Sequence, residues 1–294
     1  MVCAVNQDSP GNVIRTSIDS LSGILHPAPR SLAHSHADLP LFLGCAGWSI
    51  ASRYIDDFPR TGTHLERYAR VFNAVEINSS FYRSHQQQTY ARWRQSVPRE
   101  FRFSVKIPRT VTHNRRLHDT QDLLLQFVDE VAGLQEKLGC LLVQLPPSLH
   151  FEESVAFRFF TLARRYFSCQ IACEARHASW FASSASLLLN ECSITRVFAD
   201  PAIEQNNGRM PTTATGYRRL HGQPRMYYSA YGLSYLRRLA DELIAGAQAT
   251  ALQWCIFDNT AEGAATSDAL LLKSILDPGT VSQAFNGPPD GEVT

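Results

Sequence analysis

The stretch FRFSVKI (101–107), DLLLQFVDEVAGLQEKLG (122–139) and CLLVQL (140–145) decides the fold. The first and last runs are short and rich in apolar residues, as buried strands are. In the run between them, Leu, Phe and Val recur three and four residues apart, which gives a helix one apolar face. A strand, a helix and a second strand in this order predict a parallel β/α unit with a right-handed crossover.

The same unit repeats along the chain. Further strand-like runs are LFLGCAG (41–47), AVEIN (74–78), QIACEAR (170–176), TRVFAD (195–200), YRRLHG (217–222) and LQWCIFDN (252–259). Segments with helical period lie between most of them, at 64–72, 88–97, 155–167, 233–248 and 267–276. Eight strands within residues 39–278 predict a TIM-type (β/α)8 barrel, a parallel closed sheet with outer helices. The connection PAIEQNNGRMPTTATG (201–216) reads as a loop.

The two ends of the chain differ from this barrel domain. Residues 1–38 and 279–294 lack a sustained period, and we interpret them as a flexible N-terminal leader and a flexible C-terminal tail. The formal net charge is +1 and no basic stretch occurs, so nucleic acid is not an expected partner. No apolar run reaches the roughly 18 residues of a membrane span, and the start is a poor signal peptide. We therefore expect a soluble, cytoplasmic protein without a membrane partner.

The sequence identifies no cofactor. There is no GxGxxG, Walker or GxSxG motif, which leaves nucleotide-cofactor and serine-hydrolase chemistry without support. The seven cysteines include no CxxC pair, and most lie inside apolar runs. We interpret them as small buried hydrophobic residues and predict no metal ligand among them.

Strand parity predicts which side chains point into the barrel. The outer face of each strand packs on helices, so polar residues that alternate with apolar ones face inward. In AVEIN, Val75 and Ile77 face the helices, and Glu76 and Asn78 point inward. The same rule selects Lys106, Gln144, Glu174, Arg176, Asp200, Arg219, His221 and Asn259. These residues fall late in their strands, where barrels of this type place their active sites. Alternatively, the three carboxylates and three cations merely neutralise one another in the barrel mouth.

Several motifs in this order and spacing resemble the DUF72 (YecE-like) family from about Leu41 to Leu276. They are GCAGWSI, FNAVEINSSFYR, FRFSVKIPRTVTH, KLGCLLVQLPPS, CEARHASW, YRRLHG and FDNT. The resemblance implies a TIM-type barrel whose biochemical function is not established. It implies signature roles for most of the residues above and adds Trp48, Tyr82, His113, His177, Trp180 and Gly222. The chain departs from the family pattern at Ala175, at Arg218, which should face the helices, and at Asp258, where the family usually has Asn.

The leading functional hypothesis is an enzyme that acts by acid–base catalysis on a small anionic or sugar-like substrate, with the reaction class (hydrolase, lyase or isomerase) left open. The catalytic residues would be Glu76, Lys106, Glu174 and His221, whose pKa values burial and neighbouring charges can tune. A Schiff-base role for Lys106 is a variant. The substrate-binding residues would be Trp48, Asn78, Tyr82, His113, Gln144, Arg176, His177, Trp180, Asp200, Arg219 and Asn259. The two arginines suit a bidentate contact with an anion, and the aromatic residues either line the site or pack under loops.

Two other functions stay open. A divalent-metal-dependent hydrolase or isomerase would use Glu76, Glu174, Asp200 and His221, an oxygen-rich set that suits magnesium or manganese. A non-catalytic ligand- or nucleic-acid-binding module would use the barrel mouth together with Arg115 and Arg116.

Overall fold

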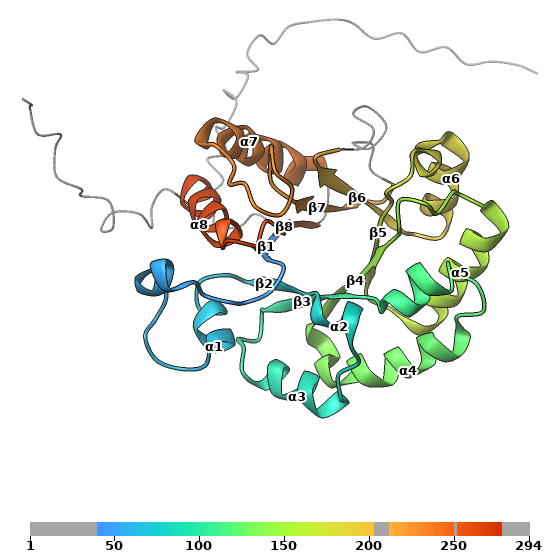
Figure 1. The fold of residues 1–294 in the computed structure, drawn as a ribbon, viewed down its shortest axis with the longest axis horizontal. Coiled ribbons are helices and arrows are strands. Elements are labelled where there is room, and N and C mark those ends of the chain that lie inside the picture. Colours follow the sequence, from blue (N-terminus) through green and yellow to red (C-terminus); the bar gives the residue numbers. More distant parts are fainter. Residues whose placement is uncertain (1–39, 203–211, 250–251, 278–294) are drawn as a thin grey trace, which may run out of the picture. The chain divides into compact units, whose positions relative to one another are not determined.

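The computed structural model describes residues 40–202, 212–249 and 252–277 (Figure 1). The leader, the tail and most of the connection between the sixth and seventh strands lie outside these ranges. The strands are β1 (Leu41–Cys45), β2 (Ala74–Ile77), β3 (Arg102–Lys106), β4 (Leu138–Gln144), β5 (Gln170–Glu174), β6 (Thr195–Asp200), β7 (Thr215–Leu220) and β8 (Leu252–Phe257). They form one sheet in the order β1-β8-β7-β6-β5-β4-β3-β2, with every ladder parallel. The predicted TIM-type barrel is confirmed.

Helices surround the strands, as Figure 1 shows. They are α1 (His64–Tyr68), α2 (Ser79–Tyr82), α3 (Gln87–Gln95), α4 (Gln121–Val131), α5 (Glu153–Tyr166), α6 (Ser183–Glu191), α7 (Leu233–Ala249) and α8 (Ala264–Leu276). Short helical turns cover Ser52–Asp57, Thr110–Asn114, Ala132–Lys137 and Ala178–Phe181. Within the described parts of the chain, no helix combines the length and the apolarity that crossing a bilayer requires.

The helix predicted over 122–139 is shorter than expected. It ends at Val131 and continues as a 3₁₀ turn in which Gln135 has a φ of 47°. A side chain at Gly133 would place its Cβ 2.2 Å from the Gln87 carbonyl oxygen, so α3 can pack closely only against a glycine. This close packing accompanies the break in the helix, and β4 then begins at Leu138.

The two faces of the strands pack in two separate apolar layers. Between barrel and helices lie Val75, Ile77, Phe101, Phe103, Val105, Ile107, Leu141, Val143, Ile171 and Cys173, as parity predicts for the second to fifth strands. Inside the barrel lie Ala74, Cys140, Leu142, Ala172, Val197, Tyr217, Trp254 and Ile256. The lower interior is therefore apolar, and the polar interior begins one layer higher.

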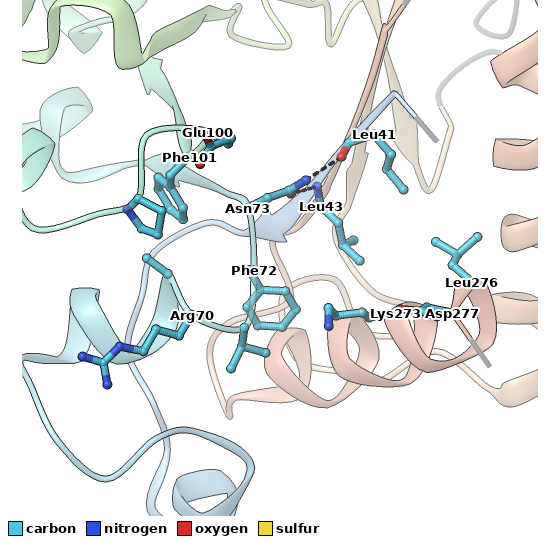
Figure 2. Close-up of a pocket in the computed structure, with 13 residues that line it drawn as sticks. Leu41, Leu43, Arg70, Phe72, Asn73, Glu100, Phe101, Lys273, Leu276 and Asp277 are labelled. Atoms are coloured by element: carbon cyan, nitrogen blue, oxygen red, sulfur yellow. Dashed lines mark hydrogen bonds between the residues drawn. The ribbon is translucent and has the colours of Figure 1, made fainter. Parts of the chain in front are cut away.

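Side chains bridge the seam between β1 and β2, for which the described residues show no backbone ladder. Asn73 accepts a hydrogen bond from Leu43 N and donates one to Leu41 O, both at 2.8 Å (Figure 2). Tyr68 OH accepts from Cys45 N at 2.7 Å and lies 3.1 Å from Ala74 O, to which it donates. These four contacts satisfy backbone groups that a ladder would otherwise pair.

We expect Tyr68→Phe to destabilise the barrel by about 2 kcal/mol or more, because Cys45 N and Ala74 O would then be buried without partners. Urea unfolding followed by tryptophan fluorescence measures the change. Tyr90→Phe is the matched control: Tyr90 is equally buried, but its hydroxyl has no hydrogen-bond partner among the described residues. Equal losses in the two variants would contradict the role of Tyr68 at the seam.

Candidate functional site

Arg219 lies at the centre of a buried charge network at the carboxyl ends of the strands. Its Nε and Nη2 donate to the two oxygens of Glu76 at 2.9 and 2.7 Å. Nη1 donates to Glu174, and Nη2 also donates to Asp258 at 2.9 Å. Burial alone would lower the pKa of Arg219, but the three carboxylates outweigh it and hold that pKa well above its ordinary value. The guanidinium therefore stays charged and fixes all three acids.

Glu76 is enclosed from below as well. The hydroxyl of Tyr217 lies 2.9 Å from Glu76 Oε2 and 2.7 Å from Ser104 Oγ, and the Tyr217 ring stacks on Trp254. Both oxygens of Glu76 are bound, and the residue is 0% exposed. This geometry favours a role for Glu76 in positioning Arg219 over direct contact with a substrate.

His221 bridges the other two carboxylates. Its Nδ1 lies 2.9 Å from Asp258 Oδ2, and its Nε2 lies 3.2 Å from Glu174 Oε1. Burial disfavours a charge on the imidazole, but Glu174 and Asp258 outweigh it and raise the pKa of His221 above its ordinary value of 6.5. Burial likewise opposes the carboxylates, yet Arg219 above all keeps the pKa of Glu174 well below 4.5 and that of Asp258 below 3.8. In both pairs, His221 with Glu174 and His221 with Asp258, these shifts favour a protonated imidazole and an ionised carboxylate.

Arg176 and Asn78 lie on the solvent side of this network. Arg176 forms an ion pair with Glu174, and its Nη2 is 3.0 Å from His221 Nε2. Asn78 Nδ2 donates to Asp258 Oδ1 at 3.3 Å. Arg176 Nε and Asn78 Oδ1 are buried and have no hydrogen-bond partner within the described ranges. Both atoms are open to hydrogen bonding with a ligand or a water molecule.

Lys106, at the end of β3, is the cation whose hydrogen-bonding capacity is unused. Its Nζ lies 4.3 Å from the centre of the Phe81 ring, a cation–π contact. The residue is 7% exposed, and no described residue forms a hydrogen bond or an ion pair with its ammonium group. Burial first, and then the charge of Arg219, lower the pKa of Lys106 below 10.5, although the nearby carboxylates oppose the shift.

Three further predicted residues border this region. Gln144 is half-buried and pairs in register with Glu174 on the adjacent strand. His113 packs edge-on against the Phe81 ring, and burial, together with the charge of Lys106, lowers the pKa of His113. His177 instead caps the turn that follows β5, because its Nδ1 accepts a hydrogen bond from Ser179 N at 3.2 Å.

Asp200 and Asn259 do not point into the barrel, so these two predictions were wrong. In β6, Val197 lies inside, which turns Asp200 to the opposite face, where it accepts a hydrogen bond from Tyr231 OH at 3.0 Å. In β8, Trp254 and Ile256 lie inside. The parity of these strands is therefore opposite to the one expected.

Asp258, rather than Asn259, occupies the inward position at the end of β8. Asn259 donates instead to Asp268 of α8 at 2.7 Å and to Ser229 O at 2.9 Å. In the sequence, Asp258 is distinguished from its neighbours only by its departure from the family pattern. The alternation Trp254, Ile256, Asp258 is the signal that identifies it.

The three predicted aromatic residues lie apart from the network. Trp180 is 1% exposed, and its Nε1 donates to Leu149 O at 2.9 Å, so it packs under a loop. Trp48 packs edge-on against Trp93 of α3 at 5.1 Å. Tyr82 is 73% exposed and packs edge-on against the Phe81 ring at 4.9 Å. None of the three shows a contact with the charged residues of the network in the described structure.

The donor set of the metal alternative is not gathered in one place. Asp200 faces away, and Arg219 already binds Glu76 and Glu174. Among the residues that the structure describes, no three His, Cys, Asp or Glu side chains are arranged to hold a metal ion. This geometry does not favour a divalent-metal site.

An apolar hollow of about 330 Å³ lies at the opposite end of the barrel from the network. Figure 2 shows it beside the start of β1, with Leu41, Phe72 and Leu276 in its wall. Its lining contains none of the network residues. We place the candidate site at the carboxyl ends of the strands, because the buried network of charged side chains lies there.

Comparison with known proteins agrees with this architecture. The family model "Protein of unknown function DUF72" matches residues 42–290. The UPF0759 protein YecE of Escherichia coli K12 is 31% identical over 152 residues, which are 48% of this chain and 50% of that protein. The alignment thus spans about half the length of the curated relative.

Two crystal structures have a similar fold. The DUF72 family protein of Enterococcus faecalis V583 matches with a TM-score of 0.69 at 20% identity, covering 81% of this chain and 95% of that one. The DUF72 family protein of Thermotoga maritima MSB8 matches with a TM-score of 0.69 at 24% identity, covering 81% and 99%. Because the family model matches most of the chain, from residue 42 to residue 290, the chain belongs to the DUF72 family.

Proposed function

We propose that the chain is an enzyme that acts by acid–base catalysis on a small anionic or sugar-like substrate at the carboxyl-end rim of the barrel. The observation that carries the proposal is Lys106. Arg219, Arg176 and a protonated His221 match the three carboxylates charge for charge, so the ammonium of Lys106 is left over. A purely structural network of three carboxylates would already be neutral without Lys106, whose ammonium contacts the Phe81 ring, forms no hydrogen bond with a described residue and is therefore available to a substrate.

The unused polar atoms define what a substrate must offer. Arg176 provides positive charge for an anionic group such as a carboxylate or a phosphate. The unpaired Asn78 Oδ1 accepts a hydrogen bond, which suits the hydroxyl of a sugar-like molecule. Together these groups favour a small polar molecule that carries both an anionic group and a hydroxyl.

Proton transfer falls to two groups whose pKa values are shifted by burial and by neighbouring charges. His221 has a raised pKa and acts as the acid through Asp258, because the imidazole is buried and both its nitrogens face carboxylates. Lys106 has a lowered pKa and acts as the base in its neutral form. Glu174 has a pKa well below its ordinary value, so it is a weak base and serves mainly to hold His221 charged. Asp258 lies between His221 and Asn78 and connects the acid to the ligand side.

The test is a matched pair of substitutions. We expect Asp258→Ala to lower turnover by about 100-fold or more, the usual contribution of a group that supports acid–base catalysis. Asp200→Ala is the control, because Asp200 also ends a strand and is buried but lies outside the network. A panel of sugar phosphates and hydroxy acids is first screened by thermal shift, and turnover of each binding compound is then measured by mass spectrometry.

Two outcomes would count against the proposal. One is that no compound of the panel binds to or is converted by the wild-type chain. The other is that Asp200→Ala loses as much activity as Asp258→Ala while both variants stay folded by circular dichroism.

A further inference from the structure

We propose that Lys106 is a nucleophile that forms a Schiff base with the carbonyl group of its substrate. The inference rests on the site proposed above and narrows its substrate class to aldehydes and ketones that carry a polar or anionic group. A cation at position 106 could also serve anion binding alone, for which arginine would be equally suitable.

The composition of the chain provides the first argument. The chain contains 25 arginines and only three lysines, Lys106, Lys137 and Lys273. Arginine binds carboxylates and phosphates at least as well as lysine does, and it keeps its charge at any physiological pH. A lysine at the barrel mouth of such an arginine-rich chain indicates a task for which arginine is unsuitable. Becoming a neutral, nucleophilic amine is such a task.

The surroundings of Lys106 provide the second argument. Its Nζ is held over the Phe81 ring and forms no hydrogen bond with any described residue, so among these residues no donor occupies its lone pair once a proton is lost. Burial and the charge of Arg219 lower its pKa, which raises the neutral fraction. Lys137 shows the contrast, because its ammonium group donates to Arg94 O at 2.8 Å and Val97 O at 2.7 Å.

The chemistry balances with groups of this site. The neutral amine attacks the carbonyl carbon, a C–N bond forms, and the carbonyl oxygen takes up a proton as the nitrogen loses one. The resulting carbinolamine then expels its hydroxyl group as water, with a proton supplied by the His221–Asp258 pair, and the C=N bond forms. No electrons are gained or lost overall, so no oxidant or reductant takes part.

The test traps the imine by reduction. The full-length wild-type chain is incubated with pyruvate, glyoxylate, glyceraldehyde or dihydroxyacetone phosphate, and sodium borohydride then reduces any imine to a stable secondary amine. Peptide mapping by mass spectrometry locates the adduct. We expect labelling at Lys106 with at least one probe and its complete loss in Lys106→Arg, which keeps the positive charge. Lys137 and Lys273 are internal controls within the same molecule.

The outcomes separate this inference from the proposed function. Labelling of Lys273 as strong as that of Lys106 indicates non-specific reaction and overturns the Schiff base. So does the absence of any Lys106 adduct over the whole panel. If probes still raise the melting temperature, or if a compound is converted without an adduct, only the covalent step fails and acid–base catalysis stands.

Discussion

Arg219→Met is expected to be the most destabilising single substitution in this barrel, with a loss of about 4 kcal/mol or more in the free energy of unfolding. Methionine fills a similar volume but leaves Glu76, Glu174 and Asp258 as buried acids without their common partner. Removal of one partner from a buried ion pair costs about 3–5 kcal/mol, and Arg219 serves three carboxylates. Urea unfolding at pH 7 measures the loss.

The adjacent residue provides the control. Arg218 points to the outside of the barrel, as predicted from the sequence, and pairs with Glu242 of α7 at 2.8 Å. That pair is partly exposed, with side-chain exposures of 20% and 42%, so Arg218→Met should cost less than about 1 kcal/mol. If both variants lost the same stability, the network could not be the buried ionic core that its distances indicate.

Such a loss would also show that the candidate site and the upper core of the barrel are the same structure. Glu76 reaches Tyr217, and Tyr217 stacks on Trp254 of the apolar layer below. A substitution in the network therefore changes folding and chemistry together. This is why the activity tests compare variants that are similarly buried and include a measure of folding.

Sequence parity worked where only one face of a strand is apolar. In β3, Phe103 and Val105 face the helices, while Ser104 and Lys106 alternate with them, so the inward set is visible in the sequence. The same holds for Glu174, because its two neighbours in the sequence, Cys173 and Ala175, both lie on the outer face. These strands carry polar residues at inward positions, so polar and apolar residues alternate visibly in the sequence.

Parity failed in β6 because polar residues also point outward there: Arg196, on the same face as Asp200, donates to Trp180 O at 3.0 Å. It failed in β8 because both faces of that strand are apolar. Trp254 and Ile256 fill the lower interior, whereas Cys255 and Phe257 pack on the helices. The run WCIF thus shows no alternation, and nothing in it decides whether Asp258 or the next residue turns inward. Because the lower interior of the barrel is apolar, the inward and outward residues of β8 look alike in the sequence up to Phe257.

The connections within the site were also beyond the sequence. Parity gathered Arg219, Glu174 and His221 at one rim but could not show that His221 bridges two carboxylates. Nor could it show that no described residue forms a hydrogen bond with the ammonium group of Lys106, because hydrogen bonding is a property of the packed site. The family resemblance added residues such as Trp180, whose burial shows a packing role that a motif does not reveal.

The second large effect is a pH-dependent loss of stability in Glu174→Gln. Glutamine keeps the shape of the side chain but removes a charge that Arg219, Arg176 and His221 all contact, so about 3 kcal/mol should be lost near neutral pH. Glu242→Gln is the control, because that carboxylate is partly exposed and lies outside the network.

The difference between wild type and Glu174→Gln should be largest from about pH 4.5 to 6.5 and should narrow on both sides. The folded pKa of Glu174 lies well below its ordinary value of 4.5, so its stabilisation is present above 4.5 and disappears as the pH falls through the folded pKa. The folded pKa of His221 lies above 6.5, so the stabilisation from its charge is complete below 6.5 and disappears as the pH rises through the folded pKa. Glu174 supplies part of that second contribution, so the variant lacks it at every pH. Urea unfolding of both proteins at intervals from pH 3.5 to 9 traces the two limbs, and a difference that stays constant over this range would mean that Glu174 and His221 are not a charged pair in the folded barrel.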